Sequence, residues 1–265
     1  MPQPKRKKRK VKVPSRSARY ARSPKPSKTA EDQYSLALRR LVREWAKVVR
    51  KEVLPAAKAV TAGTRQDAKD PKGAGKKLSA AAKRLANASS VGKAIDKAAK
   101  TTDKHTRKEL IKLGISPDKT PGLTKLFKNW RKSNVSLIRR FLDTEAEKMT
   151  TLLEGSFGRR FESVAKDIQE RLGVTSRRAD LIARDQSLSL NAQIAKSKQE
   201  AAGISEYIWT SAGDAKVRDL HTVLDGQRFK FSEPPVSSAD GSRGHPGEPI
   251  NCRCTQYPVI PALDD

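Results

Sequence analysis

The chain of 265 residues is poor in the residue types that usually reveal a protein's chemistry, with 2 cysteines, 3 histidines and only 5% aromatic residues. Two cysteines cannot supply the framework of a disulfide-rich domain. Cys252 and Cys254 are separated by a single residue, so a bond between them would close a small, strained ring. The sequence therefore predicts free thiols and a protein made in a reducing cytoplasm.

Long apolar runs are also lacking, since no stretch approaches the roughly 18–20 residues of a membrane span. The N-terminus is basic, but it lacks the apolar segment of a signal peptide. We therefore expect no membrane partner.

Familiar enzyme signatures are missing as well. Neither the H-E-x-x-H pattern of zinc hydrolases nor the G-x-S-x-G pattern of serine hydrolases occurs. The G-A-G-K-K run at 73–77 suggests a phosphate-binding loop, but that motif requires glycine in place of Asp70 and Ser or Thr in place of Lys77. The sequence therefore predicts a protein that is not an enzyme.

Positive charge, by contrast, is abundant and unevenly distributed, with a formal net charge of +27. Residues 1–30 hold 12 basic residues and no acids, residues 31–150 hold 29 basic and 13 acidic residues, and residues 151–265 hold 15 basic and 16 acidic residues. This asymmetry predicts a polyanionic partner for the N-terminal half. Because no groove-reading motif is present, any contact with nucleic acid should involve phosphates and be non-specific.

Residues 1–30 have the composition of a disordered basic arm. Part of the arm also resembles a nuclear-import tag, but a phosphate-binding tail is the simpler interpretation. The candidate phosphate-binding residues are Lys5, Arg6, Lys7, Lys8, Arg9, Lys10, Lys12, Arg16, Arg19 and Arg22.

A Lys/Ala-rich helical region is predicted for residues 31–113. Apolar residues recur at steps of three and four from Tyr34 onward, which indicates an amphipathic helix that Pro55 should end or bend. Residues 61–77 are expected to be a flexible connector, and residues 78–113 to form two helices with a solvated cationic face.

A helical body is predicted for residues 114–203. Gly173 follows an apolar stripe at 161–172, in the position of a helix C-cap. Thr175 or Ser176 should then cap the N-terminus of a further helix.

Composition changes again at residues 204–265, which we expect to form a compact module. Strand-like residues occur at 206–209 and at 227–231. The predicted fold class is therefore α+β: a mainly helical body with a small C-terminal α/β module and a disordered basic N-terminal arm.

Both cysteines and two of the three histidines lie in this module. Zinc prefers such donors, so His221, His245, Cys252 and Cys254 are candidate ligands of one structural zinc ion, with Asp214 as a replacement for His245. The Cys-x-Cys spacing is tighter than usual, so a metal-free clip of buried thiols and a hydrogen-bonded histidine stays open. Catalysis is a third interpretation, but no glutamate stands at a recognised offset from a ligand histidine to act as a general base.

Five other residues of the module are expected to stabilise its fold. Arg218 follows Asp214 by four positions, a spacing that permits an ion pair along a helix. Asp225 and Gly226 mark a tight turn, and Trp209 is expected to be a core anchor.

Several motifs occur in order between Asn134 and Cys254. They are N-x-x-L-I at 134–138, R-A-x-x-I-A-R at 178–184, A-G-I at 202–204, W-T-S at 209–211, D-x-x-V-R-x-x-H-x-x-L-D-G-Q at 214–227 and P-G-x-P-x-N-C-R-C at 246–254. In these motifs the chain resembles the phage Mu F-like minor head protein family, also called phage head morphogenesis proteins. The A-R-D-Q run at 183–186 departs from the family, in which Thr-Glu usually follows the arginine.

The resemblance implies a non-enzymatic minor component of a virion, located inside the head near the portal and assembled in the host cytoplasm. The implied partners are the portal protein, major capsid or scaffold proteins, and packaged double-stranded DNA. Two other functions stay open: a free nucleoid-like DNA-binding protein with a zinc-stabilised C-terminal module, and a metal-dependent hydrolase.

Overall fold

The structure, a computed structural model, describes residues 15, 18–19, 23–63, 69–116 and 119–260. Contacts in space divide the chain into two compact units. The helical unit comprises residues 27–105 and 122–190, and the mixed unit comprises residues 1–26, 106–121 and 191–265. Each unit therefore combines segments that are far apart in the sequence.

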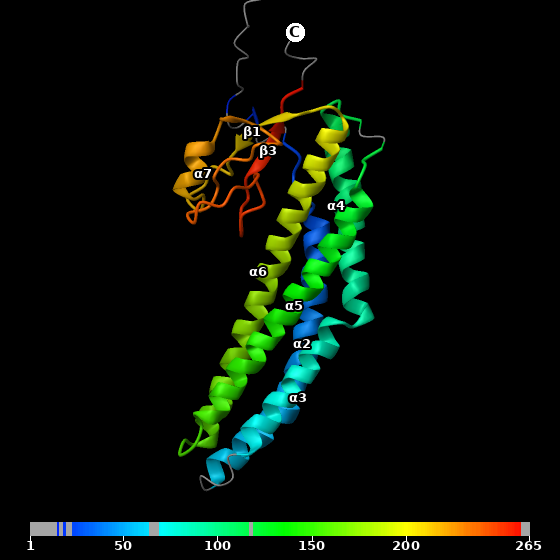
Figure 1. The fold of residues 1–265 in the computed structure, drawn as a ribbon. Helices are drawn as coiled ribbons and strands as arrows, with labels where there is room; N and C mark the ends of the chain where they lie inside the picture. The colour runs from blue at the N-terminus through cyan, green and yellow to red at the C-terminus, as the bar shows by residue number, and fades with distance from the viewer. Residues whose placement is uncertain (1–14, 16–17, 20–22, 64–68, 117–118, 261–265) are drawn as a thin grey trace, which may run out of the picture. The chain divides into compact units, whose positions relative to one another are not determined.

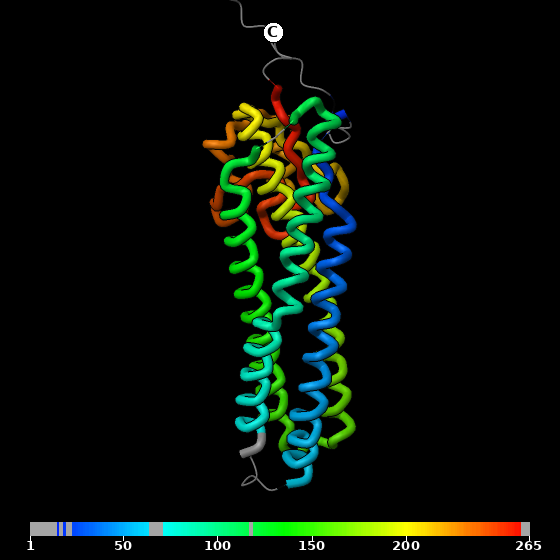
Figure 2. Tube along the Cα trace, turned by 90° about the vertical axis from the view of Figure 1, so that its right-hand side faces the viewer, coloured from blue at the N-terminus to red at the C-terminus, as the bar shows by residue number. Residues whose placement is uncertain are grey.

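The helical unit is a bundle of long amphipathic helices. They are α2 (Lys28–Ala62), α3 (Lys69–Ala86), α4 (Ser89–Lys112), α5 (Leu123–Glu154) and α6 (Phe161–Ala201), and the C-terminal ends of α4 and α6 belong to the mixed unit. Helices α2 and α5 run in one direction, and α3, α4 and α6 run in the other (Figures 1 and 2). No helix in the described part of the chain is both long and apolar enough to span a membrane.

Ordered structure begins earlier than the sequence predicts. Helix α2 starts at Lys28, and the Ser27 hydroxyl accepts a hydrogen bond from the Ala30 N–H at 3.2 Å, which caps the helix. Ser23 and Ser27 are buried. The prediction of a disordered arm is therefore wrong for residues 23–30. The predicted phosphate-binding residues Lys5, Arg6, Lys7, Lys8, Arg9, Lys10, Lys12, Arg16 and Arg22 lie outside the described residues.

Two predicted interruptions of the N-terminal helices are corrected. Helix α2 continues through the exposed Pro55 to Ala62, because buried residues on both sides of the proline share one packed face. The predicted connector is also shorter than 61–77, since α3 begins at Lys69. A Cβ atom at Gly75 would lie only 2.7 Å from Thr150 Oγ1, so this glycine lets α3 pack closely against α5 rather than form a flexible loop.

The predicted break at Gly173 is also absent, because α6 is continuous from Phe161 to Ala201. Thr175 does not cap a new helix. Its hydroxyl lies 2.9 Å from Glu145 Oε2 and 2.9 Å from the Arg171 carbonyl oxygen. Threonine would weaken an isolated helix, but here the contact of Thr175 with Glu145 of α5 stabilises α6.

Glu145 is the centre of a buried polar cluster between α5 and α6. Its carboxylate is fully buried and accepts two hydrogen bonds from Arg171, at 2.7 and 2.8 Å, and one from Arg178 at 2.8 Å. Burial disfavours the ionised form, but hydrogen bonds from Arg171 and Thr175 outweigh it and lower the pKa of Glu145. The cluster therefore holds an ionised carboxylate inside the bundle.

The mixed unit contains a three-stranded antiparallel sheet in the order β2-β1-β3. The strands are β1 (Glu206–Thr210), β2 (Arg228–Lys230) and β3 (Thr255–Pro258), and a short helix, α7 (Asp219–Leu224), lies between β1 and β2 in the sequence. The core of this unit is formed by Leu110, Ile115, Ile204, Tyr207, Trp209, Leu224, Phe231, Cys252 and Cys254. A mainly helical chain with a small sheet near its C-terminus confirms this part of the predicted fold class.

Candidate metal centre

His221 is positioned by α7 and by the turn that follows this helix. Gly226 adopts a φ of +80°, in the left-handed region that favours glycine. Its N–H donates to the Trp209 carbonyl oxygen, and the Trp209 N–H donates to the Gln227 carbonyl oxygen, both at 2.9 Å. The turn therefore ties the end of α7 to β1.

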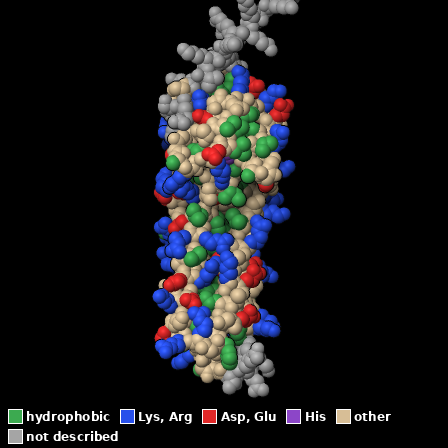
Figure 3. All heavy atoms as spheres, turned by 90° about the vertical axis from the view of Figure 1, so that its left-hand side faces the viewer, with side chains coloured by type: hydrophobic (Ala, Val, Ile, Leu, Met, Phe, Trp, Pro, Cys, Tyr) green, Lys and Arg blue, Asp and Glu red, His purple; other side chains and the backbone are tan. Residues whose placement is uncertain are grey.

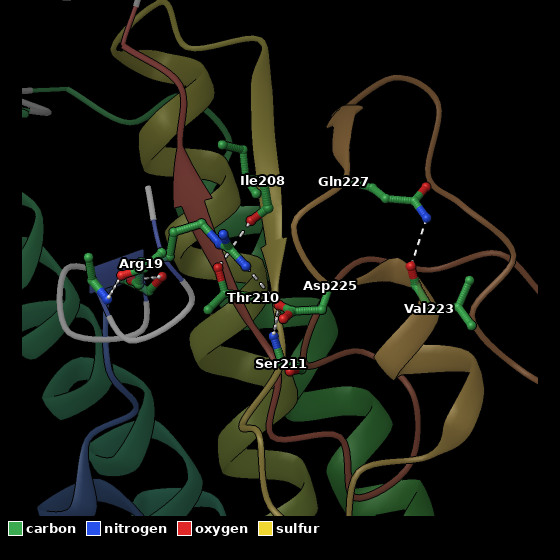
Figure 4. A network of polar contacts seen from close by, with 10 residues as sticks. Arg19, Ile208, Thr210, Ser211, Val223, Asp225 and Gln227 are labelled. Carbon is green, nitrogen blue, oxygen red and sulfur yellow. Dashed lines mark hydrogen bonds and ion pairs between the residues drawn. The ribbon is translucent and has the colours of Figure 1, made fainter. Parts of the chain in front are cut away.

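The side chain of Asp225 stabilises the same turn. Its Oδ1 accepts a hydrogen bond from the Ser211 N–H at 3.0 Å and one from Arg19 Nη2 at 3.1 Å (Figure 4). Arg19 is only 5% exposed. The prediction that Arg19 is a phosphate contact conflicts with this burial, because its guanidinium is engaged inside the mixed unit.

The two cysteines approach His221 through the pairing of β3 with β1. Cys252 and Cys254 lie just before β3, and both belong to the same core cluster as Trp209 of β1. The Trp209 ring packs against the His221 imidazole with centroids 5.2 Å apart. Sheet pairing and the α7 turn thus bring together residues more than 30 positions apart.

The three side chains form a compact buried group. His221 Nδ1 lies 3.6 Å from Cys252 Sγ and 3.6 Å from Cys254 Sγ, and the three atoms all lie within 4.8 Å of one another. His221 Nε2 lies 2.9 Å from the Ser237 carbonyl oxygen, which can only accept a hydrogen bond. Nε2 therefore carries the proton, and the Nδ1 lone pair faces the two sulfur atoms.

Hydrogen bonding favours a thiolate in this group. A hydrogen bond from Cys254 lowers the pKa of Cys252 to about 4; burial opposes the shift, and the contact with His221 and a hydrogen bond from the Gly247 N–H support it. The pKa of Cys254, the donor, is raised by that bond and by burial. The pKa of His221 is raised chiefly by its contact with Cys252.

The geometry fits a zinc ion. Zinc–sulfur bonds of about 2.3 Å and zinc–nitrogen bonds of about 2.0–2.1 Å place tetrahedral S and N ligands about 3.6 Å apart. This equals both distances from His221 Nδ1 to sulfur. Among the described residues, no other His, Cys, Asp or Glu joins the group. The arrangement therefore offers three protein ligands and leaves a fourth position to another donor.

His245, the expected fourth ligand, lies outside this group. Lys196 Nζ lies 2.9 Å from His245 Nε2, and an ammonium group can only donate, so Nε2 accepts. His245 Nδ1 must then carry the proton, which it donates to the Tyr207 hydroxyl at 3.0 Å. Both ring nitrogens are thus engaged, and burial lowers the pKa of His245.

The predicted ion pair between Asp214 and Arg218 is not formed, because α7 begins only at Asp219. Arg253 instead donates two hydrogen bonds to the Asp214 carboxylate, each at 2.5 Å, and they are the main reason why the pKa of Asp214 falls to about 2. Arg218 donates to the Ile250 carbonyl oxygen at 2.5 Å. Asp214 and Arg218 therefore each contact the segment that carries the cysteines, through Arg253 and Ile250 and not through each other. Asp214, paired with Arg253, is not a replacement ligand.

Three important contacts had no signal in the local sequence. The partner of His221 Nε2 is the backbone carbonyl of Ser237, and every residue type has such a carbonyl, so the sequence cannot point to this one. Arg19 and Asp225 are separated by 206 positions. Lys196 is one of many lysines in the chain, and only its position beside His245 distinguishes it.

Comparison with known proteins finds a family that is similar to the segment containing this site. Residues 152–257 match the family model described as "Phage Mu protein F like protein", and this range includes His221, Cys252 and Cys254. An uncharacterized protein of Haemophilus influenzae is 33% identical over 146 residues, which cover 53% of this chain and 31% of the relative. The chain thus spans less than a third of that relative's length, and no solved structure matches it. This match supports the family expected from the sequence motifs: residues 152–257 are similar to the phage Mu protein F-like family.

Proposed function

We propose that this protein is a minor head protein of a phage particle and acts in head morphogenesis, genome packaging or genome delivery. The family match over residues 152–257 carries this proposal. The role is structural rather than enzymatic. The protein would be assembled in the host cytoplasm and reside inside the head, next to the portal protein and to major capsid or scaffold proteins.

DNA contact is the second part of the proposal. The chain has a formal net charge of +27, and its basic residues are concentrated in the N-terminal half. On the face drawn in Figure 3, Lys and Arg side chains are more frequent than Asp and Glu side chains. Such a surface binds double-stranded DNA through phosphates, without sequence preference and with strong dependence on salt.

We also propose that His221, Cys252 and Cys254 hold one structural zinc ion. The observation behind this is the pair of 3.6 Å distances from one imidazole nitrogen to two buried sulfur atoms. The ion would link α7 to the segment before β3, and the Ser237 carbonyl would orient the imidazole. It would thereby stabilise a unit whose sheet has only three short strands.

Particle composition tests the proposed function. Heads purified from producing cells should contain the chain together with the portal protein, and deletion of the chain should reduce the yield of DNA-filled heads. Recovery of the chain only with host DNA and never with heads would favour a free nucleoid-like DNA-binding protein.

A metal-dependent hydrolase is a second candidate, favoured by the position that three protein ligands leave for a fourth donor. Replacing His221 with Ala separates the two possibilities. A catalytic site predicts a folded variant that assembles into heads but has lost turnover on a phosphodiester or peptide substrate. A structural site predicts loss of stability, with no turnover to lose.

A further inference from the structure

Helix α4 carries a row of basic residues on the side opposite its buried face. This lysine row consists of Lys93, Lys97, Lys100 and Lys104, and all four are exposed. At about 100° per residue, steps of four, three and four place them within an arc of about 60°. Buried residues of α4, among them Val91, Ile95 and Ala98, lie on the other side of the helix.

Two acids, Asp96 and Asp103, flank the lysine row on the same helix. Among the described residues, no acidic side chain forms an ion pair with any of its four members. Asp96, on the flank of the helix, is neutralised by Arg131 at 2.6 Å. Two exposed lysines elsewhere in the described residues differ: Lys47 lies 2.8 Å from Glu44, and Lys112 lies 2.6 Å from Glu109.

The outward face of α2 is also basic, but it is less uniform. Glu44 and the exposed Leu36 lie among its arginines and lysines. The arc of α4 between Lys93 and Lys104, by contrast, contains no acidic and no apolar residue.

The spacing of the lysine row suits a regular polyanion. The 11 steps from Lys93 to Lys104 rise by roughly 16 Å along the helix. Over this length one strand of duplex DNA presents about five phosphates, so each lysine has a phosphate within reach. A protein partner would instead be expected to meet an apolar centre with a polar rim, which the row does not provide.

We propose that the lysine row of α4 is a binding surface for the phosphate backbone of double-stranded DNA. The inference rests on the proposed function and gives its DNA contact a place in the described part of the chain. The row binds without sequence preference, because lysine ammonium groups neutralise backbone phosphates whatever the bases are.

The test compares two quadruple variants of the full chain. One replaces the row with Gln (K93Q, K97Q, K100Q and K104Q). The control replaces four lysines that already have acidic partners, and so makes the same change in formal charge: Lys28→Gln, Lys47→Gln, Lys112→Gln and Lys230→Gln. Binding to a short DNA duplex is followed by fluorescence anisotropy between about 50 and 200 mM salt.

The row variant should lose up to about 3.6 from the slope of log affinity against log salt, since each phosphate contact contributes about 0.9. Between about 50 and 200 mM salt the affinity of both proteins falls, and the factor by which it falls should be roughly a hundred times smaller for the row variant than for the wild type. The control should stay close to the wild type. Circular dichroism should show that both variants are folded.

Four outcomes would overturn the inference. Equal losses in the row variant and the control would mean that total charge, not the row, governs binding. If the wild type binds DNA and the row variant binds it equally well, another part of the chain makes the DNA contact, and the proposed function stands. Equally tight, row-dependent binding of poly-glutamate would identify an acidic protein as the partner. A wild type with no affinity for DNA would instead remove DNA contact from the proposed function itself.

Discussion

Arg19 Nη2 lies 3.1 Å from Asp225 Oδ1, although the two residues are 206 positions apart in the sequence. The side chains are 7% and 16% exposed. The same carboxylate oxygen accepts a hydrogen bond from the Ser211 N–H beside β1. The ion pair thus joins a residue near the N-terminus to the turn that positions His221.

Replacing Arg19 with Ala should destabilise the mixed unit by about 1–3 kcal/mol, because Asp225 would stay largely buried without its ionic partner. Chemical denaturation measures this change. The matched control is Arg39→Ala, which breaks the exposed pair with Asp180 and should cost at most about 1 kcal/mol. If both variants lose the same stability, the Arg19–Asp225 contact has no special structural role.

Purified protein should contain one equivalent of zinc, and Cys252→Ser should lose it together with several degrees of melting temperature. The reason is that two thiolates and one imidazole supply most of the binding energy of such a site. Elemental analysis and thermal melts with and without a chelator measure both effects. His245→Gln should retain zinc, because both nitrogens of His245 have other partners. If the wild type contains no metal and is equally stable with and without chelator, the group is a metal-free clip of buried thiols and a hydrogen-bonded histidine.

Acidification should destabilise the protein through His245. Burial lowers its folded-state pKa below the ordinary value of 6.5; the Lys196 ammonium also lowers it, and Glu248 opposes the shift. The stabilisation is present above pH 6.5 and is lost as the pH falls from 6.5 through the folded-state pKa. The free energy of unfolding, followed over this range, should fall less steeply in His245→Gln than in the wild type. Identical slopes in the two proteins would show that His245 does not carry the effect.

Glu145→Gln should destabilise the helical unit by about 2–4 kcal/mol, because the variant leaves the Arg171 guanidinium, mostly buried beside the cluster, without its carboxylate. Thermal or chemical unfolding measures the loss. Glu147→Gln, two residues away on the exposed side of α5, is the control and should change stability by no more than about 0.5 kcal/mol. A Glu145 variant as stable as this control would contradict the structural role of the cluster.

The predicted helix boundary at Gly173 and the predicted Asp214–Arg218 ion pair are absent for the same physical reason. Gly173 and Thr175 have the local signature of a helix boundary, but the hydroxyl of Thr175 meets Glu145 across the bundle and the helix continues. Asp214 and Arg218 have the spacing of an ion pair, but no helix forms there. In each case local propensity predicted one structure, and a contact from a distant part of the chain favoured another.

The sequence by itself determined the features that depend on neighbouring residues: the amphipathic helices, the short strands, the turn at Gly226, the family and the donor types of the metal group. Periodicity and turn chemistry act over a few residues, so they can be recognised without the fold. Only the tertiary structure decided which donors converge: Cys252 and Cys254 meet His221, while His245 contacts Lys196 and Tyr207. Likewise, only the tertiary structure placed Arg19 beside Asp225. These pairings follow from the packing of strands and helices that are distant in the sequence, and such packing has no local signature.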